Sequence, residues 1–94
     1  MKRVVYTKHL LYRLEVRGIT RAVPEQIVRT ATERYFDTST EHFVAVKQVW
    51  YLGKIRDMMV AYQESKTIIE LITIHPLKQD QKDGRLSSGR WIAF

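Results

Sequence analysis

Apolar positions in the first third of the chain recur at the spacing of helices. Three leucines, at positions 10, 11 and 14, form one stripe between Thr7, a residue type that caps helices, and Gly18, a residue type that ends them. The residues before Thr7 are β-branched or aromatic. The pattern therefore predicts a short strand over Arg3–Tyr6 and a helix over Lys8–Arg17.

A second helix is predicted shortly afterwards. Ile27, Val28 and Ala31 form its apolar face. Pro24 is well tolerated in a first helical turn, whereas Thr20 can act as an N-cap. The pattern leaves both starting points open.

From residue 34 onward the chain becomes rich in aromatic and β-branched residues, interrupted by short polar turns. Connections this short make neighbouring strands antiparallel. The alternation of apolar and polar residues is imperfect, so we expect helices on one face of the sheet and partial cover on the other. The predicted strands are Arg34–Asp37, His42–Leu52, Ile55–Gln63 and Thr67–Ile74.

The tail, Pro76–Phe94, is polar until its last five residues, and we expect Trp91 and Phe94 to lie in the core or at a partner contact. Met58 and Met59 are expected to fill the core. The elements follow the order β-α-α-β-β-β-β. This order predicts one α+β domain over residues 1–94, with the N-terminal strand and two helices packed on one face of an antiparallel meander.

Composition narrows the class of protein. The chain has 94 residues, of which 45% are hydrophobic, and no cysteine, which excludes disulfides and thiolate chemistry. No apolar run approaches the roughly 20 residues of a membrane-spanning helix, and the start lacks the apolar region of a signal peptide. We therefore expect a cytoplasmic protein without membrane contact, of undetermined oligomeric state.

Positive charge is unevenly distributed. The net charge is +6, and residues 1–34 carry eight Lys or Arg against three Glu. The tail is also basic, whereas the middle is nearly neutral. Such a concentration of positive charge at the two ends of the chain attracts polyanions, including RNA. A basic protein with no polyanionic partner is the alternative.

Four short motifs carry a resemblance to a known family. They are Thr7-Lys8-His9, Arg17-Gly18-Ile19, Thr73-Ile74-His75-Pro76 and Gly89-Arg90-Trp91. In this order and spacing they make the chain similar to short uncharacterised members of the RelE-like toxins. Residues 20–23 are a departure, because they lengthen the lead into the second helix. The resemblance implies a RelE-like fold, RNA cleavage without metal or cofactor, as by an mRNA interferase, and a cognate antitoxin as partner.

Cleavage of RNA through its own 2′-hydroxyl needs a base, an acid and cations around the phosphate, but no metal. On the first predicted helix, His9, Arg13 and Arg17 are spaced to lie along one face. Stacked cations repel each other unless an anion compensates them, which makes this face a candidate anion site. The alternative is that the arginines are solvated or paired with Glu15 or Glu25.

His75 is the second histidine candidate. It lies at the end of the last predicted strand, where Pro76 restricts its backbone to an extended conformation. Strand ends commonly carry reactive side chains. The alternative is a structural histidine bonded to a nearby carbonyl. His42 has no partner suggested by spacing and is predicted to be ordinary surface.

Lys47 and Arg56 lie on predicted strands of mainly apolar residues. Long charged side chains on such strands are expected to reach the edge of the sheet or to line a ligand groove. The resemblance implies that cationic side chains on the central strands contact RNA. It also implies that a residue of the tail, Arg85 or Arg90, completes the site. Ion pairs of the strand cations with Asp57 or Glu70 are the alternative. Tyr62 could stack on a base, but an aromatic strand residue is more often packing.

The sequence thus predicts a candidate site without metal. Its catalytic residues are His9, His75 and Arg56, and its phosphate-binding residues are Arg13, Arg17, Lys47, Arg85 and Arg90. The scattered glycines match no phosphate-binding loop, and no spacing of His, Asp and Glu suggests a metal site. A non-catalytic RNA-binding or protein-interaction module on the same fold remains the alternative function.

Overall fold

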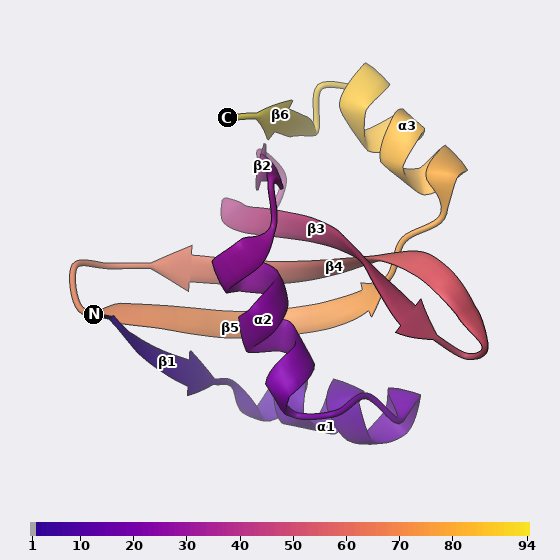
Figure 1. The fold of residues 1–94 in the computed structure, drawn as a ribbon. Helices are drawn as coiled ribbons and strands as arrows, with labels where there is room; N and C mark the ends of the chain where they lie inside the picture. The colour runs from indigo at the N-terminus through magenta and orange to yellow at the C-terminus, as the bar shows by residue number, and fades with distance from the viewer. Residues whose placement is uncertain (1) are drawn as a thin grey trace.

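The computed structural model describes residues 2–94, which form three helices and one six-stranded sheet in an α+β arrangement (Figure 1). The sheet order is β1-β5-β4-β3-β2-β6, with β1 parallel to β5 and every other neighbouring pair antiparallel. The elements are β1 (Arg3–Tyr6), α1 (Lys8–Arg17), α2 (Ala22–Thr30), β2 (Glu33–Asp37), β3 (His42–Tyr51), β4 (Lys54–Glu64), β5 (Ile68–Pro76), α3 (Gln79–Ser87) and β6 (Trp91–Ala93).

The predicted strands and the first helix are confirmed. The predicted place of the N-terminal strand on one face of the meander is wrong, because β1 joins the edge of the sheet, parallel to β5. Each strand of the meander β2–β5 begins and ends within two residues of its predicted bounds. The second helix begins at Ala22, between the two predicted starts. The antiparallel pairing of the meander follows from the short turns that join its strands.

Thr7 fixes both the start of α1 and its position on the sheet. Its Oγ1 accepts a hydrogen bond from the Leu10 N–H at 3.1 Å and donates to the Ile72 carbonyl at 3.0 Å. The helix ends at Gly18, whose φ of 64° lies in the left-handed region that glycine adopts without strain. The cap therefore joins α1 to β5 as well as starting the helix.

Substituting Thr7→Ala is expected to lower the free energy of unfolding by about 1 kcal/mol, because the first turn of α1 loses its capping oxygen. Thr7→Ser keeps that oxygen and is expected to stay close to the wild type. Urea unfolding of the three proteins, followed by circular dichroism, measures the difference. Equal loss in both variants would mean that the threonine methyl group, rather than the cap, stabilises this corner.

Both faces of the central sheet are covered. Helices α1 and α2 pack on one face through residues such as Leu10 and Ile27, against strand residues such as Met58. The opposite face buries Met59 together with Trp91 from the tail. Five consecutive residues of β4, 58–62, are therefore buried, which explains why its apolar positions do not alternate. Tyr62 belongs to the first of these clusters and is a packing residue.

The tail differs from the prediction. It contains a helix, α3, and an edge strand, β6, which pairs with β2. None of the residues of α3 is buried, so its sequence has no apolar stripe from which the helix could be predicted. Trp91 is buried, with 2% of its surface exposed, as expected for the core. Phe94 is 67% exposed and is not a core residue, because β6 ends just before it and leaves it at the surface.

The β3–β4 hairpin extends past the end of β5. Strand β5 ends at Pro76, which pairs with Met58, whereas β4 begins four residues earlier, at Lys54. The hairpin consequently projects from the sheet on the side where β5 turns toward α3 (Figure 1). This overhang forms one wall of the candidate site.

Candidate functional site

His75 lies between two pockets. The first, here called the hairpin pocket, has a volume of about 550 Å³ and occupies the space beyond the end of β5, below the overhanging hairpin. Its walls come from the C-terminal end of α1, the start of β4 and the connection from β5 to α3. Its lining residues are Arg17, Lys54, Ile55, Arg56, Asp57, His75, Pro76, Leu77, Lys78, Gln79 and Gln81.

The second pocket, here called the sheet-face pocket, is smaller, with a volume of about 110 Å³. It lies on the sheet face that the tail covers. Among residues 2–94, His75 is the one lining residue that the two pockets share. The lining residues of the sheet-face pocket are Asp37, Thr40, His42, Val44, Met59, Ala61, Thr73, His75, Arg85, Arg90 and Trp91.

The environment of His75 favours a neutral imidazole. Burial is the largest cause that lowers its pKa below the ordinary 6.5, and the positive charges of Arg85, Arg17 and Arg13 lower it further. The Pro76 carbonyl, 2.9 Å from Nδ1, opposes this shift. A carbonyl only accepts hydrogen bonds, so Nδ1 carries the hydrogen and the neutral ring keeps a lone pair on Nε2. His75 can therefore accept a proton at neutral pH.

Arg85 lies beside His75 in the sheet-face pocket. Its Nη1 is 3.8 Å from the Met59 sulfur, and Met59 is the strand partner of His75. Its guanidinium carbon lies 5.0 Å from the centre of the Trp91 ring. A thioether and an aromatic ring position the group, and the nearby carboxylate of Asp37, which is bonded to Arg90, acts on its charge without forming a salt bridge to it within residues 2–94.

Arg17 and Arg56 supply cations to the hairpin pocket. The Nε of Arg17 is buried and has no hydrogen-bond partner within residues 2–94. Arg56 donates from Nε to the Tyr51 carbonyl at 3.1 Å and lies 6.0 Å from the centre of the Tyr51 ring. The Tyr51 hydroxyl in turn donates to the Arg17 carbonyl at 3.0 Å, which ties the hairpin to α1.

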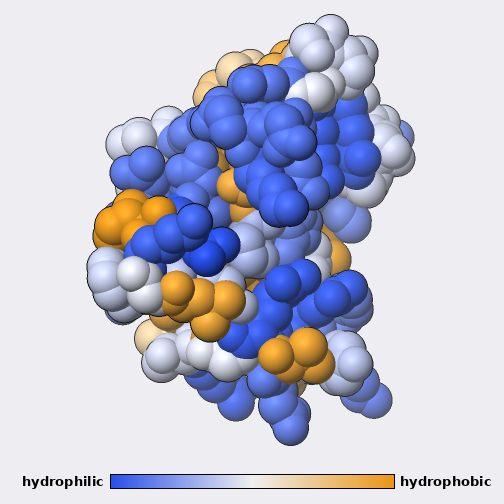
Figure 2. Space-filling view, turned by 90° about the vertical axis from the view of Figure 1, so that its right-hand side faces the viewer, coloured by the Kyte–Doolittle hydropathy of each residue, from blue (hydrophilic) through white to orange (hydrophobic). Residues whose placement is uncertain are grey.

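The hairpin pocket is strongly basic. Besides His75 it is lined by two arginines and two lysines, against the single carboxylate of Asp57. Figure 2 views this side of the molecule and shows hydrophilic side chains over most of it, interrupted by separate hydrophobic groups. Such a lining attracts anions, and guanidinium groups match the geometry of phosphate.

Arg90 has a different role from Arg85. Its Nε and Nη2 donate to the carboxylate of Asp37 at 3.1–3.2 Å. The same carboxylate accepts a bond from Trp91 Nε1 at 3.1 Å. The positive charge of Arg90 is therefore largely compensated, and the side chain fastens the tail to β2.

Three of the residues predicted from the sequence do not line these two pockets. His9 and Arg13 interact with each other on α1, with 3.5 Å between His9 Nε2 and Arg13 Nε. Lys47 reaches across to α2 and donates to the Thr30 hydroxyl. Among residues 2–94, neither Arg13 nor Arg17 forms the ion pair considered as an alternative, because Glu25 binds Arg29 instead.

The structure also brings in residues that the sequence interpretation missed. His42 lines the sheet-face pocket, although it was predicted to be ordinary surface. Alternation along β3 could have found it, because His42 lies on the same face as the buried Val44 and Val46. Lys78 lines the hairpin pocket as the N-cap of α3, and it was missed because that helix was not predicted.

Within residues 2–94, no group of three or more His, Cys, Asp or Glu side chains is arranged to hold a metal ion. No helix in the same range is long and apolar enough to cross a membrane. Comparisons with protein families, with curated proteins and with solved structures found no match for this chain.

Proposed function

We propose that this chain is a toxin-type RNA-binding protein with a RelE-like fold and that it cleaves RNA without a metal ion at His75. The observation that carries the proposal is the setting of His75. A half-buried imidazole with a lowered pKa stands between two pockets, next to the guanidinium of Arg85, which forms no salt bridge within residues 2–94. A neutral base beside a phosphate-binding cation is the arrangement that 2′-hydroxyl cleavage needs.

In the proposed reaction, His75 Nε2 takes the proton of a ribose 2′-hydroxyl. The 2′-oxygen attacks the adjacent phosphorus, the bond to the 5′-oxygen breaks, and that oxygen takes a proton from water at the open side of the pocket. Arg85 stabilises the charge that builds on the non-bridging oxygens. The products are a 2′,3′-cyclic phosphate and a 5′-hydroxyl, and water later restores the protonation state of His75.

The cations of the hairpin pocket would hold neighbouring phosphates of the same strand. Arg17 and Arg56 line this pocket and contribute their positive charge there. In the cell, a cytoplasmic antitoxin with acidic side chains would compete for this pocket and block cleavage. The alternative function, RNA binding without cleavage, needs only these cations.

Incubation of the purified protein with end-labelled RNA in the presence of EDTA tests the proposal. We expect fragments that end in 2′,3′-cyclic phosphate, and a loss of cleavage of at least about 100-fold in His75→Ala, because the base is removed. His9→Ala is the matched control. It removes an exposed histidine that lines neither pocket, and it should cleave like the wild type.

Equal cleavage by His75→Ala and the wild type, or cleavage that EDTA abolishes, would overturn the proposed reaction. Salt-dependent RNA binding without fragments, with naked RNA and with ribosome-bound RNA alike, would select the non-catalytic alternative.

A further inference from the structure

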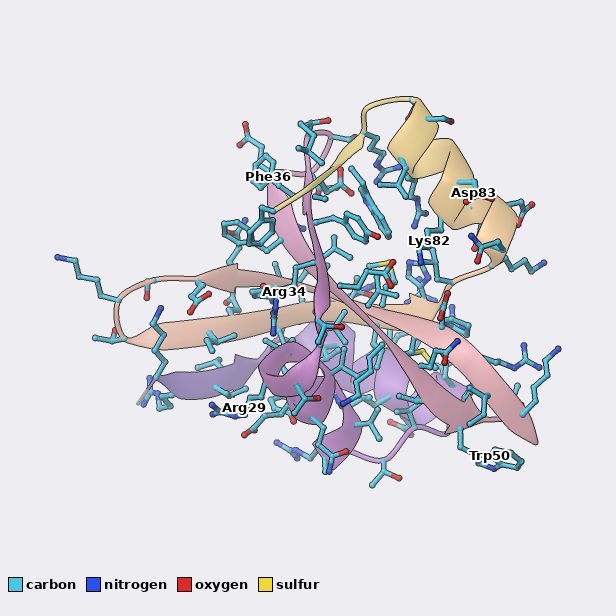
Figure 3. The ribbon with its side chains drawn as sticks, turned by 45° about the horizontal axis from the view of Figure 1, so that its top comes forward. Arg29, Arg34, Phe36, Trp50, Lys82 and Asp83 are labelled. Atoms are coloured by element: carbon cyan, nitrogen blue, oxygen red, sulfur yellow. The ribbon has the colours of Figure 1, made fainter. Side chains whose placement is uncertain are left out.

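The tip of the β3–β4 hairpin exposes large hydrophobic side chains. Trp50 is 70% exposed, Leu52 71% and Ile55 57%. Figure 3 shows Trp50 at the outer end of the hairpin, with its indole clear of the rest of the fold. A single exposed hydrophobic residue is ordinary, but three within six positions on a projecting hairpin indicate a contact surface.

This tip is continuous with the hairpin pocket. Trp50 and Ile55 are direct partners in the β3–β4 ladder, and Ile55 itself lines the pocket. By strand alternation both lie on the same face of the hairpin as Met59, the partner of His75. Ile55 and Met59 are four positions apart along the strand, which is roughly 13 Å. A few nucleotides of an extended strand can bridge that distance.

The charge of the hairpin is predominantly positive. From Lys47 to Asp57 it carries one carboxylate, which strand alternation places on the face of Trp50, and three cations, which it places on the other face. Two of them, Lys54 and Arg56, line the hairpin pocket. A flat indole next to a pocket lined by cations matches a nucleotide, whose base stacks on the ring while its phosphate reaches the pocket. Contact between the tips of two copies of the chain would instead bring like charges together.

We propose that Trp50 stacks on an unpaired base of single-stranded RNA whose phosphates occupy the hairpin pocket. This inference rests on the proposed function for the binding of RNA, and adds the class of substrate. In a duplex the faces of the bases are covered by their neighbours, so an indole at the tip finds a free face only on a single strand. The hairpin tip thus selects single-stranded segments and positions them for His75.

Tryptophan fluorescence tests the inference directly. The chain has two tryptophans, and Trp91 lines the sheet-face pocket, so Trp50→Phe is measured in parallel and the quenching that this variant loses reports on Trp50. The probe is a short 2′-O-methyl RNA, which binds but cannot be cleaved through its 2′-oxygen, offered as a single strand or as a duplex at low salt. We expect quenching and tighter binding with the single strand.

Substitutions separate stacking from general hydrophobic contact. Trp50→Leu should bind the single strand about tenfold more weakly, whereas Trp50→Phe keeps a ring and should recover most of that loss. Tyr12→Leu is the matched control, because it removes an exposed ring from α1, at a position that lines neither pocket. Its affinity should equal that of the wild type.

Unchanged affinity in Trp50→Leu, or equal binding of single strand and duplex, would overturn the inference. If Trp50→Leu left RNA affinity unchanged but turned a dimer into a monomer in sedimentation, the tip would be a self-association surface. The proposed cleavage of RNA and the proposed stacking on Trp50 can be rejected independently of each other. Quenching without cleavage of unmodified RNA would reject the nuclease and keep the stacking, whereas cleavage unaffected by Trp50→Leu would reject the stacking alone.

Discussion

Asp37→Ala is expected to lower the free energy of unfolding by about 3 kcal/mol and the melting temperature by roughly 15 °C. The reason is the number of groups that one buried carboxylate holds together. It accepts bonds from the side chains of Arg90 and Trp91 and from the backbone N–H groups of Ser39 and Thr40. Alanine leaves the buried indole N–H without its acceptor and releases β6 from the turn after β2.

Thermal unfolding measures this effect, with Asp83→Ala as the control. Asp83 is an exposed carboxylate on α3 that accepts one side-chain bond, from Gln79. Its removal should change stability by less than about 0.5 kcal/mol. A comparable loss in the two variants would mean that net charge, rather than the Asp37 network, determines the difference.

The same network predicts how stability depends on pH. Burial alone would raise the pKa of Asp37, but the hydrogen bonds from Arg90, Trp91 and the turn outweigh it and lower the pKa to about 2, from an ordinary 3.8. A lowered pKa in the folded state stabilises the fold above the unfolded value and loses that contribution as pH falls. We therefore expect about 2 kcal/mol of stability to disappear between pH 4 and pH 2 in the wild type but not in Asp37→Ala.

The sequence predicted the elements whose stabilising contacts are local. The meander follows from short turns between β-rich segments, and α1 follows from a cap, an apolar stripe and Gly18. Helix α3 has no buried apolar stripe that would predict it, and contacts distant in sequence help to stabilise it. Lys82 binds Glu33 on β2 and points from α3 toward the strands (Figure 3). The parallel pairing of β1 with β5, in which Arg3 faces Ile68, joins residues far apart in the sequence and cannot be predicted from local sequence patterns.

In the candidate site, too, the sequence predicted the local arrangement of residues but not the arrangement that depends on the whole fold. Helical spacing placed His9, Arg13 and Arg17 along one face of α1, but eight residues of helix extend about 12 Å. Only the last turn of α1 therefore reaches the hairpin pocket, through Arg17. Lys47 pairs with Met58, on the face toward the helices, which is opposite to the face of His75. Strand register decides such positions, and register depends on the whole sheet.

Arg85→Met is expected to reduce the proposed RNA cleavage by about 100-fold, because the transition state loses the guanidinium beside His75. The substitution also acts on His75 itself. The charge of Arg85 disfavours the imidazolium, so its removal raises the pKa of His75. A general base must be neutral, so the low-pH limb of kcat/KM should move to higher pH in Arg85→Met. Arg85→Lys keeps the positive charge and should keep the limb nearer its wild-type position.

Titration of the His75 Cε1–H resonance by NMR measures this pKa without RNA, with His75→Ala to assign the signal. Arg29→Met is the matched control, because it removes an arginine that binds Glu25 on the surface of α2. It should leave the pKa of His75 unchanged. If Arg85→Met also left it unchanged, Arg85 would not face the imidazole, and the proposed pairing of base and phosphate clamp would be wrong. If the pKa rose while cleavage remained at the wild-type level, the geometry would stand and another cation, such as Arg17, would hold the reacting phosphate.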